Sequence, residues 1–331
     1  MAPRPEQPEP FLRGCAWPSG AGVSYPRADP RDFTRLPIDT WGCAQLPVSV
    51  RLEFVGDASA VAISYRTTTD ELGYRGEGAG RSFTLWRQGV QVDEGTAVLG
   101  EGNVTLRCGA GDGRAIVYLP EGMKPTVIAI EGVGGSISPA PLQPRWLAYG
   151  DSVAEGWIAS GPALAWPAIA GRRFELDVCN LGYAGSARGE TVSAEHVASL
   201  PADVISITHG TNCWTRIPHS AEMMLAITRA FLSIVRQSHP ATPVVVASPV
   251  VRPDAEETPN RLGATLPDLR RAMERATLER VDEGDKHLSF VDGTDLLAPE
   301  HLEDGIHPGD AGHQILASTI GERVREALWS S

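Results

Sequence analysis

A serine, a histidine and an aspartate have the types and spacing that acyl-transfer chemistry requires. Ser152 follows Gly-Asp in the segment WLAYGDSVAEGW, where four largely apolar residues run into a small polar triplet. Asp304 and His307 lie three residues apart near the other end of the printed sequence. A serine hydroxyl becomes a good nucleophile when a base takes its proton, and an imidazole oriented by a carboxylate is such a base. We therefore predict a catalytic triad of Ser152, Asp304 and His307.

Hydrogen-bond donors for a developing oxyanion are available in the same set of segments. The backbone N–H groups of Ser152 and Gly185 and the side-chain amide of Asn212 are the candidates. Each such donor stabilises the transition state by roughly 3 to 4 kcal/mol. Gly185 has no side chain, so its N–H can approach a ligand closely. Gly182 in the same segment, NLGYAGSARGE, is an alternative for this role.

Each candidate also has a purely structural interpretation. Ser152 can be a helix N-cap, because Asp and Ser both cap helices well. The segment with Asp304 and His307 can be a solvated acidic loop, and Gly185 and Asn212 can be ordinary turn residues. The presence of all these segments in one chain favours the catalytic interpretation.

A metal site is a further alternative for the histidines. His301, His307 and His313 are spaced by six residues, with Asp304 and Asp310 between them. This spacing matches neither helical nor usual zinc-ligand separations, and the triad already accounts for His307. We expect no metal at these histidines.

Substrate-binding residues are predicted from their proximity to the catalytic candidates. Aromatic and charged side chains within a few residues of those candidates are expected to line an acyl or alcohol pocket, with ordinary packing as the alternative for each. They are Trp157, Tyr183, Arg188, Glu190, Trp214 and Arg216. No long apolar insertion resembling a lid is visible, which favours a small acyl group.

The elements that must position these residues are predicted in the second half of the chain. Short apolar runs alternate with longer segments at helical spacing, and the expected strands are RWLAYG, ELDVCNLG, ADVISITHG, TPVVVASPV and HLSFVDG. Residues 220–237 and 267–283 each place apolar side chains on one helical face. Strands separated by helices indicate a doubly wound α/β fold with a parallel five-stranded sheet. Ligands of such sheets bind beyond the carboxyl ends of the strands, where the candidates lie.

The first half of the chain has a different pattern. Short runs that alternate apolar with polar residues end on Gly, Pro or Asp: VSVRLEFVG, AVAISYRTT, RSFTLWRQG, NVTLRCGAG, RAIVYLP and PTVIAIEGV. This pattern predicts antiparallel strands in a β-sandwich. The proline-rich segment SISPAPLQPR then indicates a linker. We predict an N-terminal β-sandwich domain over 1–140 and a catalytic domain over 141–331.

Composition excludes several classes of partner. With 29 basic and 41 acidic residues the formal charge is −12, which opposes attraction to nucleic acid and to anionic membranes. The start, MAPRPEQPEPFLRG, has no apolar run of signal-peptide length, and no window is long and apolar enough for a spanning helix. The five cysteines are scattered and form no C-x-x-C pair. We predict a cytoplasmic protein that acts on a small-molecule ester or acyl donor, and self-association stays open.

Four segments, taken together, resemble the SGNH subgroup of the GDSL hydrolases. They occur in the family's order, within about residues 145 to 331: Gly150-Asp151-Ser152, Asn180 to Gly185, Gly210-Thr211-Asn212 and Asp304-Gly305-Ile306-His307. The resemblance implies a flavodoxin-like fold without metal or cofactor. It also implies that Ser152 is the nucleophile, that Gly185 and Asn212 are oxyanion donors, and that Asp304 with His307 completes the triad.

Three details of the resemblance concern single positions. The spacing of Gly185 from Asn180 fits the family's second segment and favours Gly185 over Gly182. Cys213 follows Asn212 where the family commonly has aspartate, so any contact made by that aspartate is in doubt. Val153 stands where many members have leucine, which is a minor departure.

The resemblance supports more than one function. Family members are esterases, lipases, carbohydrate deacetylases and some acyltransferases, and a jelly-roll-like β-domain before the catalytic domain resembles some two-domain carbohydrate esterases. Our leading hypothesis is a serine esterase that hydrolyses a small acyl ester, of a sugar or natural product, through an acyl-Ser152 intermediate. The alternatives are an acyltransferase from a thioester or ester donor to an alcohol, as in natural-product biosynthesis, and a non-catalytic carbohydrate-binding protein.

Overall fold

The computed structural model describes residues 5–73, 76–111 and 113–330. The chain forms two compact units, which we call the antiparallel unit and the parallel unit after their strands. The first comprises Met1–Arg31, Gln45–Gln143 and Ser160–Ala163, and the second comprises Asp32–Ala44, Pro144–Ala159 and Leu164–Ser331. The division into domains 1–140 and 141–331 stays a prediction. The units differ from this division at two segments: residues 32–44 belong to the parallel unit, and residues 160–163 belong to the antiparallel unit.

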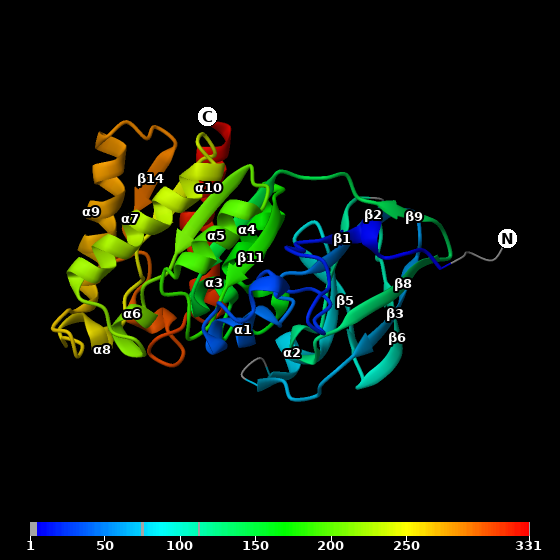
Figure 1. The fold of residues 1–331 in the computed structure, drawn as a ribbon. Coiled ribbons are helices and arrows are strands. Elements are labelled where there is room, and N and C mark those ends of the chain that lie inside the picture. Colours follow the sequence, from blue (N-terminus) through cyan, green and yellow to red (C-terminus); the bar gives the residue numbers. More distant parts are fainter. Residues whose placement is uncertain (1–4, 74–75, 112, 331) are drawn as a thin grey trace. The chain divides into compact units, whose positions relative to one another are not determined.

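The antiparallel unit contains two sheets (Figure 1). The first has the order β1-β2-β7-β4-β5, with β9 also paired to β2: β1 Leu12–Arg13, β2 Arg51–Gly56, β4 Ser82–Arg87, β5 Val90–Thr96, β7 Ala115–Tyr118 and β9 Ile137–Pro139. The second has the order β6-β3-β8: β3 Ala60–Thr67, β6 Gly100–Arg107 and β8 Thr126–Val133. Each of the six expected runs overlaps one of these strands. β1, β5 and β9 are additions. β1 and β9 are only two and three residues long, and β5 is mostly exposed and lacks a continuous apolar face.

Both antiparallel sheets contribute to one apolar core. Phe54 of β2 and Phe83 of β4 share this core with Ile63 and Tyr65 of β3, and all four are buried. The rings of Tyr65 and Phe83 lie 4.9 Å apart, which joins one sheet to the other. Alternating strands have therefore buried their apolar faces against each other, as period-2 patterning requires.

The parallel unit is built on a five-stranded sheet, as predicted. Its order is β11-β10-β12-β13-β14, and all neighbouring pairs are parallel. The strands are β10 Arg145–Gly150, β11 Asp177–Gly182, β12 Val204–Thr208, β13 Val244–Ala247 and β14 Leu288–Val291. In chain order this is 2-1-3-4-5, which places the reversal of strand order beside β10. Open α/β sheets bind ligands at that reversal.

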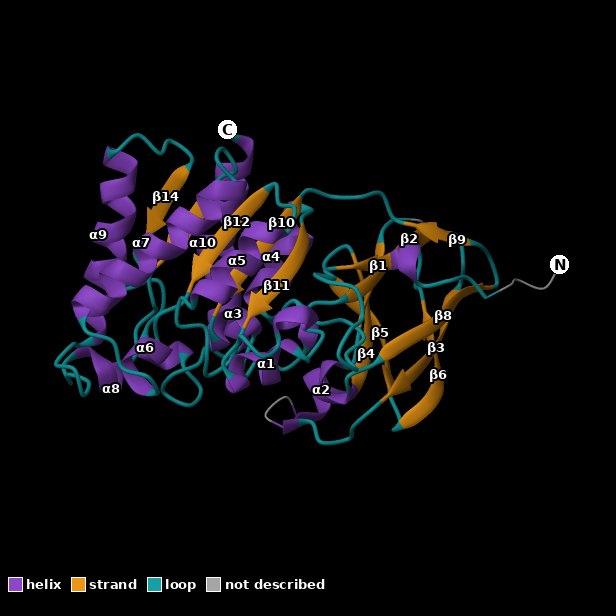
Figure 2. Ribbon diagram, in the orientation of Figure 1, coloured by secondary structure: helices purple, strands orange, loops and turns teal. Residues whose placement is uncertain are grey.

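Helices cover both faces of the parallel sheet (Figure 2). Trp146 and Ala148 of β10 belong to the core cluster that contains α4 and α10. Tyr149 points to the opposite face, because strand side chains alternate, and its ring lies 4.7 Å from Phe231 of α7. The helices of this unit are α1 Ile38–Ala44, α3 Ser152–Glu155, α4 Trp166–Phe174, α5 Thr191–Ser199, α6 Asn212–Thr215, α7 Ala221–Ser238, α8 Pro253–Glu256, α9 Leu266–Asp282 and α10 Asp310–Trp329. Among the described residues, the antiparallel unit has one short α-helix, α2 Gly76–Arg81, and the short 3-10 helices Glu9–Phe11 and Glu121–Met123.

The two helices expected from periodicity begin at sequence-encoded caps. Ser220 caps α7 by accepting a hydrogen bond from the Met223 N–H. Thr265 and Asp268 form a reciprocal capping box at the start of α9. None of the helices within the described residues combines the length and the apolar character that a bilayer span requires.

Candidate active site

The register of the parallel sheet brings the candidate segments together. Gly150, the last residue of β10, pairs with Gly182 at the end of β11 and with Thr208 at the end of β12. The loops that follow these strands therefore start at the same edge of the sheet. One carries Ser152, the next carries Gly185 and the third carries Asn212.

Ser152, His307 and Asp304 form a continuous chain of hydrogen bonds. The Ser152 Oγ lies 2.9 Å from His307 Nε2, and His307 Nδ1 lies 2.7 Å from Asp304 Oδ2. A carboxylate only accepts hydrogen bonds, so Nδ1 carries the proton and Nε2 is left to accept the serine hydroxyl. The three residues are thus arranged for proton transfer from serine to histidine.

Helix α3 presents the serine, and the residue before it provides the cap. Asp151 is the N-cap, since its Oδ1 accepts the Val153 N–H at 3.1 Å, whereas the Ser152 hydroxyl is bonded to His307. The capping interpretation therefore applies to Asp151 and not to Ser152. Burial raises the pKa of Asp151 to about 6, against the opposing effect of backbone N–H groups and Arg252.

Residues 301–309, which we call the base loop, hold Asp304 and His307 by local contacts. Asp304 Oδ1 accepts the backbone N–H groups of Ile306 and His307, at 3.0 and 2.7 Å. The Glu303 N–H donates to the His307 carbonyl, which closes the loop. Although partial burial opposes it, the hydrogen bonds from His307 and the loop backbone lower the pKa of Asp304. The Asp304 side chain is 39% exposed, so the loop is partly solvated as well as hydrogen bonded.

Trp157 packs on the candidate base. Its ring stacks on the His307 imidazole, with ring centroids 5.4 Å apart. The backbone carbonyl of Trp157 lies 3.5 Å from Nε2 of the buried His313. Burial lowers the pKa of His313 to about 4, so this imidazole is neutral at pH 7. Trp157, expected near the substrate, thus also contacts the triad.

The three histidines whose spacing suggested a metal site are each bonded to different groups. His301 Nδ1 accepts the Ala298 N–H, and His313 Nδ1 accepts the Trp166 N–H. His307 is bonded to serine and aspartate, so the three imidazoles have separate partners. No group of three or more His, Cys, Asp or Glu side chains among the described residues could hold a metal ion.

Two of the three candidate oxyanion donors have N–H groups available for a ligand. The backbone N–H groups of Ser152 and Gly185 donate to no atom in the described part of the chain. Gly185 has φ +68°, a left-handed conformation that suits glycine. The rival Gly182 donates its N–H to Asn180 Oδ1 at 2.8 Å. Of the two glycines, Gly185 therefore fits the role of oxyanion donor.

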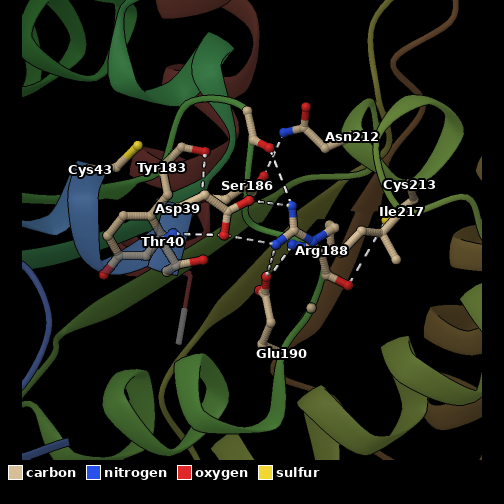
Figure 3. A network of polar contacts seen from close by, with 12 residues as sticks. Asp39, Thr40, Cys43, Tyr183, Ser186, Arg188, Glu190, Asn212, Cys213 and Ile217 are labelled. Carbon is tan, nitrogen blue, oxygen red and sulfur yellow. Dashed lines mark hydrogen bonds and ion pairs between the residues drawn. The ribbon is translucent and has the colours of Figure 1, made fainter. Parts of the chain in front are cut away.

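The third candidate donor, Asn212, lies at the start of α6. One hydrogen of its side-chain amide donates to the Ser186 carbonyl, and the amide has a second hydrogen. This bond holds Asn212 against residues 183–190, which we call the oxyanion loop (Figure 3). The remaining hydrogen can serve a ligand.

Two predicted substrate-binding residues, Tyr183 and Arg188, are buried, and a third, Glu190, is partly buried. Tyr183 is 2% exposed and packs edge-on against Tyr149. Arg188 is 4% exposed and forms ion pairs with Asp39 and Glu190. Their burial and ion pairs favour a structural role over direct substrate contact.

The remaining two predicted residues lie at the rim of the loops. The indole N–H of Trp214 donates to the Thr258 carbonyl, and Arg252 lies over its ring. Arg216 is exposed, and its guanidinium lies beside Gly185, where a Cβ atom would be 3.4 Å away. Arg216 therefore lies beside a second predicted oxyanion donor as well as close in sequence to Asn212.

Cys213 replaces the aspartate that is common in the resembling family. It is fully buried, and its Sγ lies 3.9 Å from the Arg188 carbonyl. Burial, with Glu190 and Asp151 nearby, raises the pKa of the Cys213 thiol, so it stays protonated at neutral pH. Cys213 is therefore a packing residue here and not a competing nucleophile.

Residues that sequence reasoning missed support the oxyanion loop. Glu155 is fully buried, and its Oε2 accepts the Ala184 N–H at 2.8 Å. Its only signal was its place three residues after Ser152. Asp39 and Cys43, in α1, contact Arg188 and the Ala184 carbonyl. They had no signal, because they lie far from the motif segments in the sequence.

This arrangement matches a known enzyme family. Residues 144–325, more than half of the chain, match the GDSL-like lipase/acylhydrolase family, and the matched range contains all four motif segments. The chain belongs to this family. Enzymes of the GDSL kind include hydrolases and acyltransferases, in line with the resemblance noted from the sequence.

Solved structures share the fold along most or all of the chain. A salicylyl-acyltransferase, SsfX3, from a tetracycline biosynthetic pathway has a TM-score of 0.83 and 25% identity, covering 100% of this chain and 98% of that chain. A structure described as a GDSL-like lipase from Bacteroides ovatus has a TM-score of 0.80 and 20% identity, covering 99% and 98%. A family two carbohydrate esterase from Clostridium thermocellum has a TM-score of 0.63 and 16% identity, covering 85% and 92%. No curated protein sequence matches the chain significantly.

Proposed function

We propose that this GDSL-family protein is a serine esterase that hydrolyses a small acyl ester through an acyl-Ser152 intermediate. The observation that carries the proposal is the hydrogen-bond chain from Asp304 through His307 to Ser152. The Gly185 N–H, on the loop after the neighbouring strand, donates to no atom in the described part of the chain. Such a chain activates a hydroxyl, and an adjacent donor stabilises the oxyanion that its attack creates.

In the acylation half-reaction, His307 Nε2 takes the Ser152 proton as Oγ attacks the ester carbonyl carbon. The carbonyl oxygen becomes an oxyanion that accepts hydrogen bonds from the Ser152 and Gly185 N–H groups and the Asn212 amide. Asp304 holds Nδ1–H and stabilises the imidazolium. The C–O bond to the alcohol then breaks, and the leaving oxygen takes the proton from His307.

In the deacylation half-reaction, a water molecule gives a proton to His307 and attacks the acyl carbon. Collapse of the second tetrahedral intermediate breaks the bond to Ser152 Oγ, which takes the proton back. The acid product leaves, and the enzyme returns to its starting state. The same residues thus act twice, because the second half-reaction is the reverse of the first with water as the acceptor.

Acyl transfer to an alcohol is the second candidate function. It is favoured by the likeness to the salicylyl-acyltransferase, which extends over the whole of this chain. Transfer uses the same acyl-Ser152, with an acceptor alcohol in place of water and a thioester or ester as donor. The outcome depends on how well the acyl-enzyme excludes water. The third hypothesis, a non-catalytic carbohydrate-binding protein, does not explain why Ser152, His307 and Asp304 are hydrogen bonded to one another.

Several finer expectations from the sequence belong to this proposal. The antiparallel unit is proposed to be a jelly-roll-like sandwich, with a catalytic domain over 141–331. A small-molecule ester or acyl donor is the proposed partner, and the cytoplasm is the proposed location. The apolar core that the two antiparallel sheets share supports the sandwich.

Hydrolysis of p-nitrophenyl acetate near neutral pH tests the proposal directly. The comparison is between wild type, Ser152→Ala and Ser238→Ala, where Ser238 is an exposed serine at the end of α7. We expect turnover to fall by about 10³-fold or more in Ser152→Ala and to be unchanged in Ser238→Ala. Equal rates for wild type and Ser152→Ala would remove the acyl-Ser152 route.

Partitioning of the acyl-enzyme separates the two catalytic candidates. Wild type is supplied with a salicyl thioester, with and without an alcohol acceptor, and free acid and new ester are quantified. Mostly free acid in the presence of acceptor supports the esterase. Mostly ester supports the acyltransferase.

A further inference from the structure

We propose that Asp39 is a positioning residue for the oxyanion hole, acting through Arg188 on the loop that presents the Gly185 N–H. The inference rests on the proposed function, since it assigns a support to the same site. It makes helix α1, which precedes the matched family range by about 100 residues of chain, a working part of that site.

Asp39 holds the Arg188 guanidinium at two points. Asp39 Oδ2 lies 3.0 Å from Arg188 Nη1, and Asp39 Oδ1 lies 3.1 Å from Nη2 (Figure 3). This fork-to-fork geometry fixes the plane of the guanidinium as well as its position. The two residues are 149 positions apart in the sequence but belong to the same compact unit.

Arg188 transmits that position to the oxyanion loop. Its Nη1 donates to the Gly185 carbonyl at 3.2 Å, and its own backbone N–H donates to Glu190 Oε2 at 2.9 Å. The bond to the Gly185 carbonyl limits rotation about ψ of a glycine, which has no Cβ to restrict it. Arg188 therefore fixes the residue whose N–H faces the reaction.

A second contact from α1 reaches the peptide unit that directly precedes the one bonded to Arg188. The Cys43 thiol lies 3.1 Å from the Ala184 carbonyl, which belongs to the peptide unit that contains the Gly185 N–H. A hydrogen bond to the carbonyl of a peptide polarises its N–H and orients it in the opposite direction. Glu155 accepts the N–H of the preceding peptide at 2.8 Å. The loop is thus held from α1 on one side and from α3 on the other.

The clamp places one guanidinium between two carboxylates, those of Asp39 and Glu190. The Arg188 side chain is 4% exposed and that of Asp39 is 33% exposed. A buried guanidinium that loses one carboxylate partner moves toward whatever partner or water remains. Neutralising Asp39 would therefore shift Arg188 toward Glu190, its other ion-pair partner, and release the Gly185 carbonyl.

The expected consequence is a loss of transition-state stabilisation with little change in substrate binding. The oxyanion forms only as the ester carbonyl is attacked, so a displaced Gly185 N–H affects kcat and not the ground-state complex. Misplacement by about 1 Å can cost about 100-fold in rate. For Asp39→Asn, which keeps the side-chain shape, we expect kcat to fall about tenfold and KM to change less than twofold.

The matched control is Asp32→Asn. Asp32 anchors the same 32–44 segment, through Arg35 and through His196 of α5, and its side chain is 28% exposed. It contacts no residue of the oxyanion loop within the described part of the chain. Both variants weaken the attachment of the segment, but only Asp39→Asn releases Arg188.

The measurements combine ester kinetics with binding of benzeneboronic acid. Boron forms a bond with the serine oxygen and becomes a tetrahedral anion, so its affinity reports the oxyanion hole without turnover. We expect the boronate Kd to rise about tenfold in Asp39→Asn, in parallel with the fall in kcat, and to stay within twofold in Asp32→Asn. Thermal unfolding of each variant establishes that folded protein is compared.

Two further variants keep the test decisive if Asp39→Asn folds poorly. Asp39→Glu keeps the charge and should recover part of the loss. Arg188→Gln should lose at least as much as Asp39→Asn, and the double variant should lose no more than Arg188→Gln alone.

Three outcomes would overturn the inference. They are equal losses in the Asp39 and Asp32 variants, a change only in KM, and additive losses in the double variant. The proposed function fails separately, when wild type neither cleaves the ester nor binds the boronate, and the inference then fails with it.

Discussion

The base loop and the oxyanion loop serve the same site but are held in place in opposite ways. In the base loop, Asp304 accepts hydrogen bonds from the His307 ring and from the backbone two and three residues ahead. The oxyanion loop is held by Asp39 and Cys43 of α1, by Glu155 of α3 and by Asn212 of α6. One loop is organised by its own sequence and the other by the tertiary structure.

Because the two loops are held differently, substitutions in them should differ in how they affect kcat and the free energy of unfolding. An exposed, locally bonded carboxylate contributes little to the free energy of unfolding, whereas a buried side chain that satisfies a distant backbone group contributes to both. Substitutions in the base loop should therefore change the rate alone, and substitutions around the oxyanion loop should change rate and stability together.

The largest effect is expected in the base loop. Asp304→Asn should lower kcat by about 10³ to 10⁴-fold, because an amide in place of the carboxylate favours the wrong imidazole tautomer. The free energy of unfolding should change by less than about 1 kcal/mol, because Asn Oδ1 can still accept the loop N–H groups. Ester kinetics and urea denaturation measure the two quantities.

Glu303→Gln is the control for this prediction, because Glu303 is an exposed neighbouring carboxylate outside the hydrogen-bonded triad. It should change neither quantity. A large loss of stability in Asp304→Asn would contradict the local character of the base loop.

An intermediate effect is expected from Asn212→Ala. Loss of an oxyanion donor should lower kcat by about 10² to 10³-fold. The Ser186 carbonyl also loses its buried donor, so the free energy of unfolding should fall by about 1 to 2 kcal/mol.

Asn260→Ala provides the contrast. Asn260 also donates to a backbone carbonyl, that of His219 at 2.9 Å, but lies outside the oxyanion loop. It should lower stability without an equal loss of kcat. If Asn212→Ala lowered the rate and left stability unchanged, the oxyanion loop would not depend on Asn212 for its position.

The smallest effect concerns the pH dependence of stability beneath the oxyanion loop. His209 is buried, and a Cβ on Gly189 would lie 3.1 Å from its Nε2. Neither ring nitrogen finds a hydrogen-bond partner within the described residues, and burial lowers the pKa of His209 to about 3. The neutral imidazole thus stabilises the fold fully above the unfolded-state pKa near 6.5. That contribution is lost as pH falls from there toward the folded-state pKa.

Urea denaturation at pH 7 and pH 4.5 measures this loss. His209→Phe, which cannot titrate, should lose about 2 to 3 kcal/mol less than wild type between these values. The readout is the change in the free energy of unfolding between the two pH values, compared between wild type and His209→Phe. A difference in absolute stability between the two proteins does not affect it. If wild type and His209→Phe lost the same free energy of unfolding between these pH values, His209 would accept a proton without unfolding. The interior beneath the oxyanion loop would then be hydrated.

Sequence reasoning was most successful where the signal was periodic or local. All five strands of the parallel sheet were predicted, because continuous apolar runs ending on glycine or polar residues are typical of buried parallel strands. Ser152, Asp304 and His307 were predicted to act together, and they lie within hydrogen-bond distance. Their roles in catalysis stay predictions that the kinetics of the Ser152 and Asp304 variants test.

Proximity in sequence did not indicate which partners the residues around the site contact. Arg188 and Glu190 were expected beside the substrate, but they pair with each other, and Arg188 also pairs with Asp39. Trp157 was expected near substrate and stacks on His307. A residue a few positions from a motif can point to either face of its element, and one sequence does not say which partner it meets.

The amino-acid sequence by itself determined the strands of the parallel sheet, the order of the motif segments and the pairing of Asp304 with His307, because each depends on residues close together in the chain. Only the tertiary structure decided that Asp151 caps α3 in place of Ser152, that the Gly185 N–H is available, and that α1 supports the oxyanion loop. The physical reason is distance along the chain. The Asp39 to Arg188 clamp joins residues 149 positions apart, and no periodicity or spacing encodes a contact that forms only when the whole unit has folded.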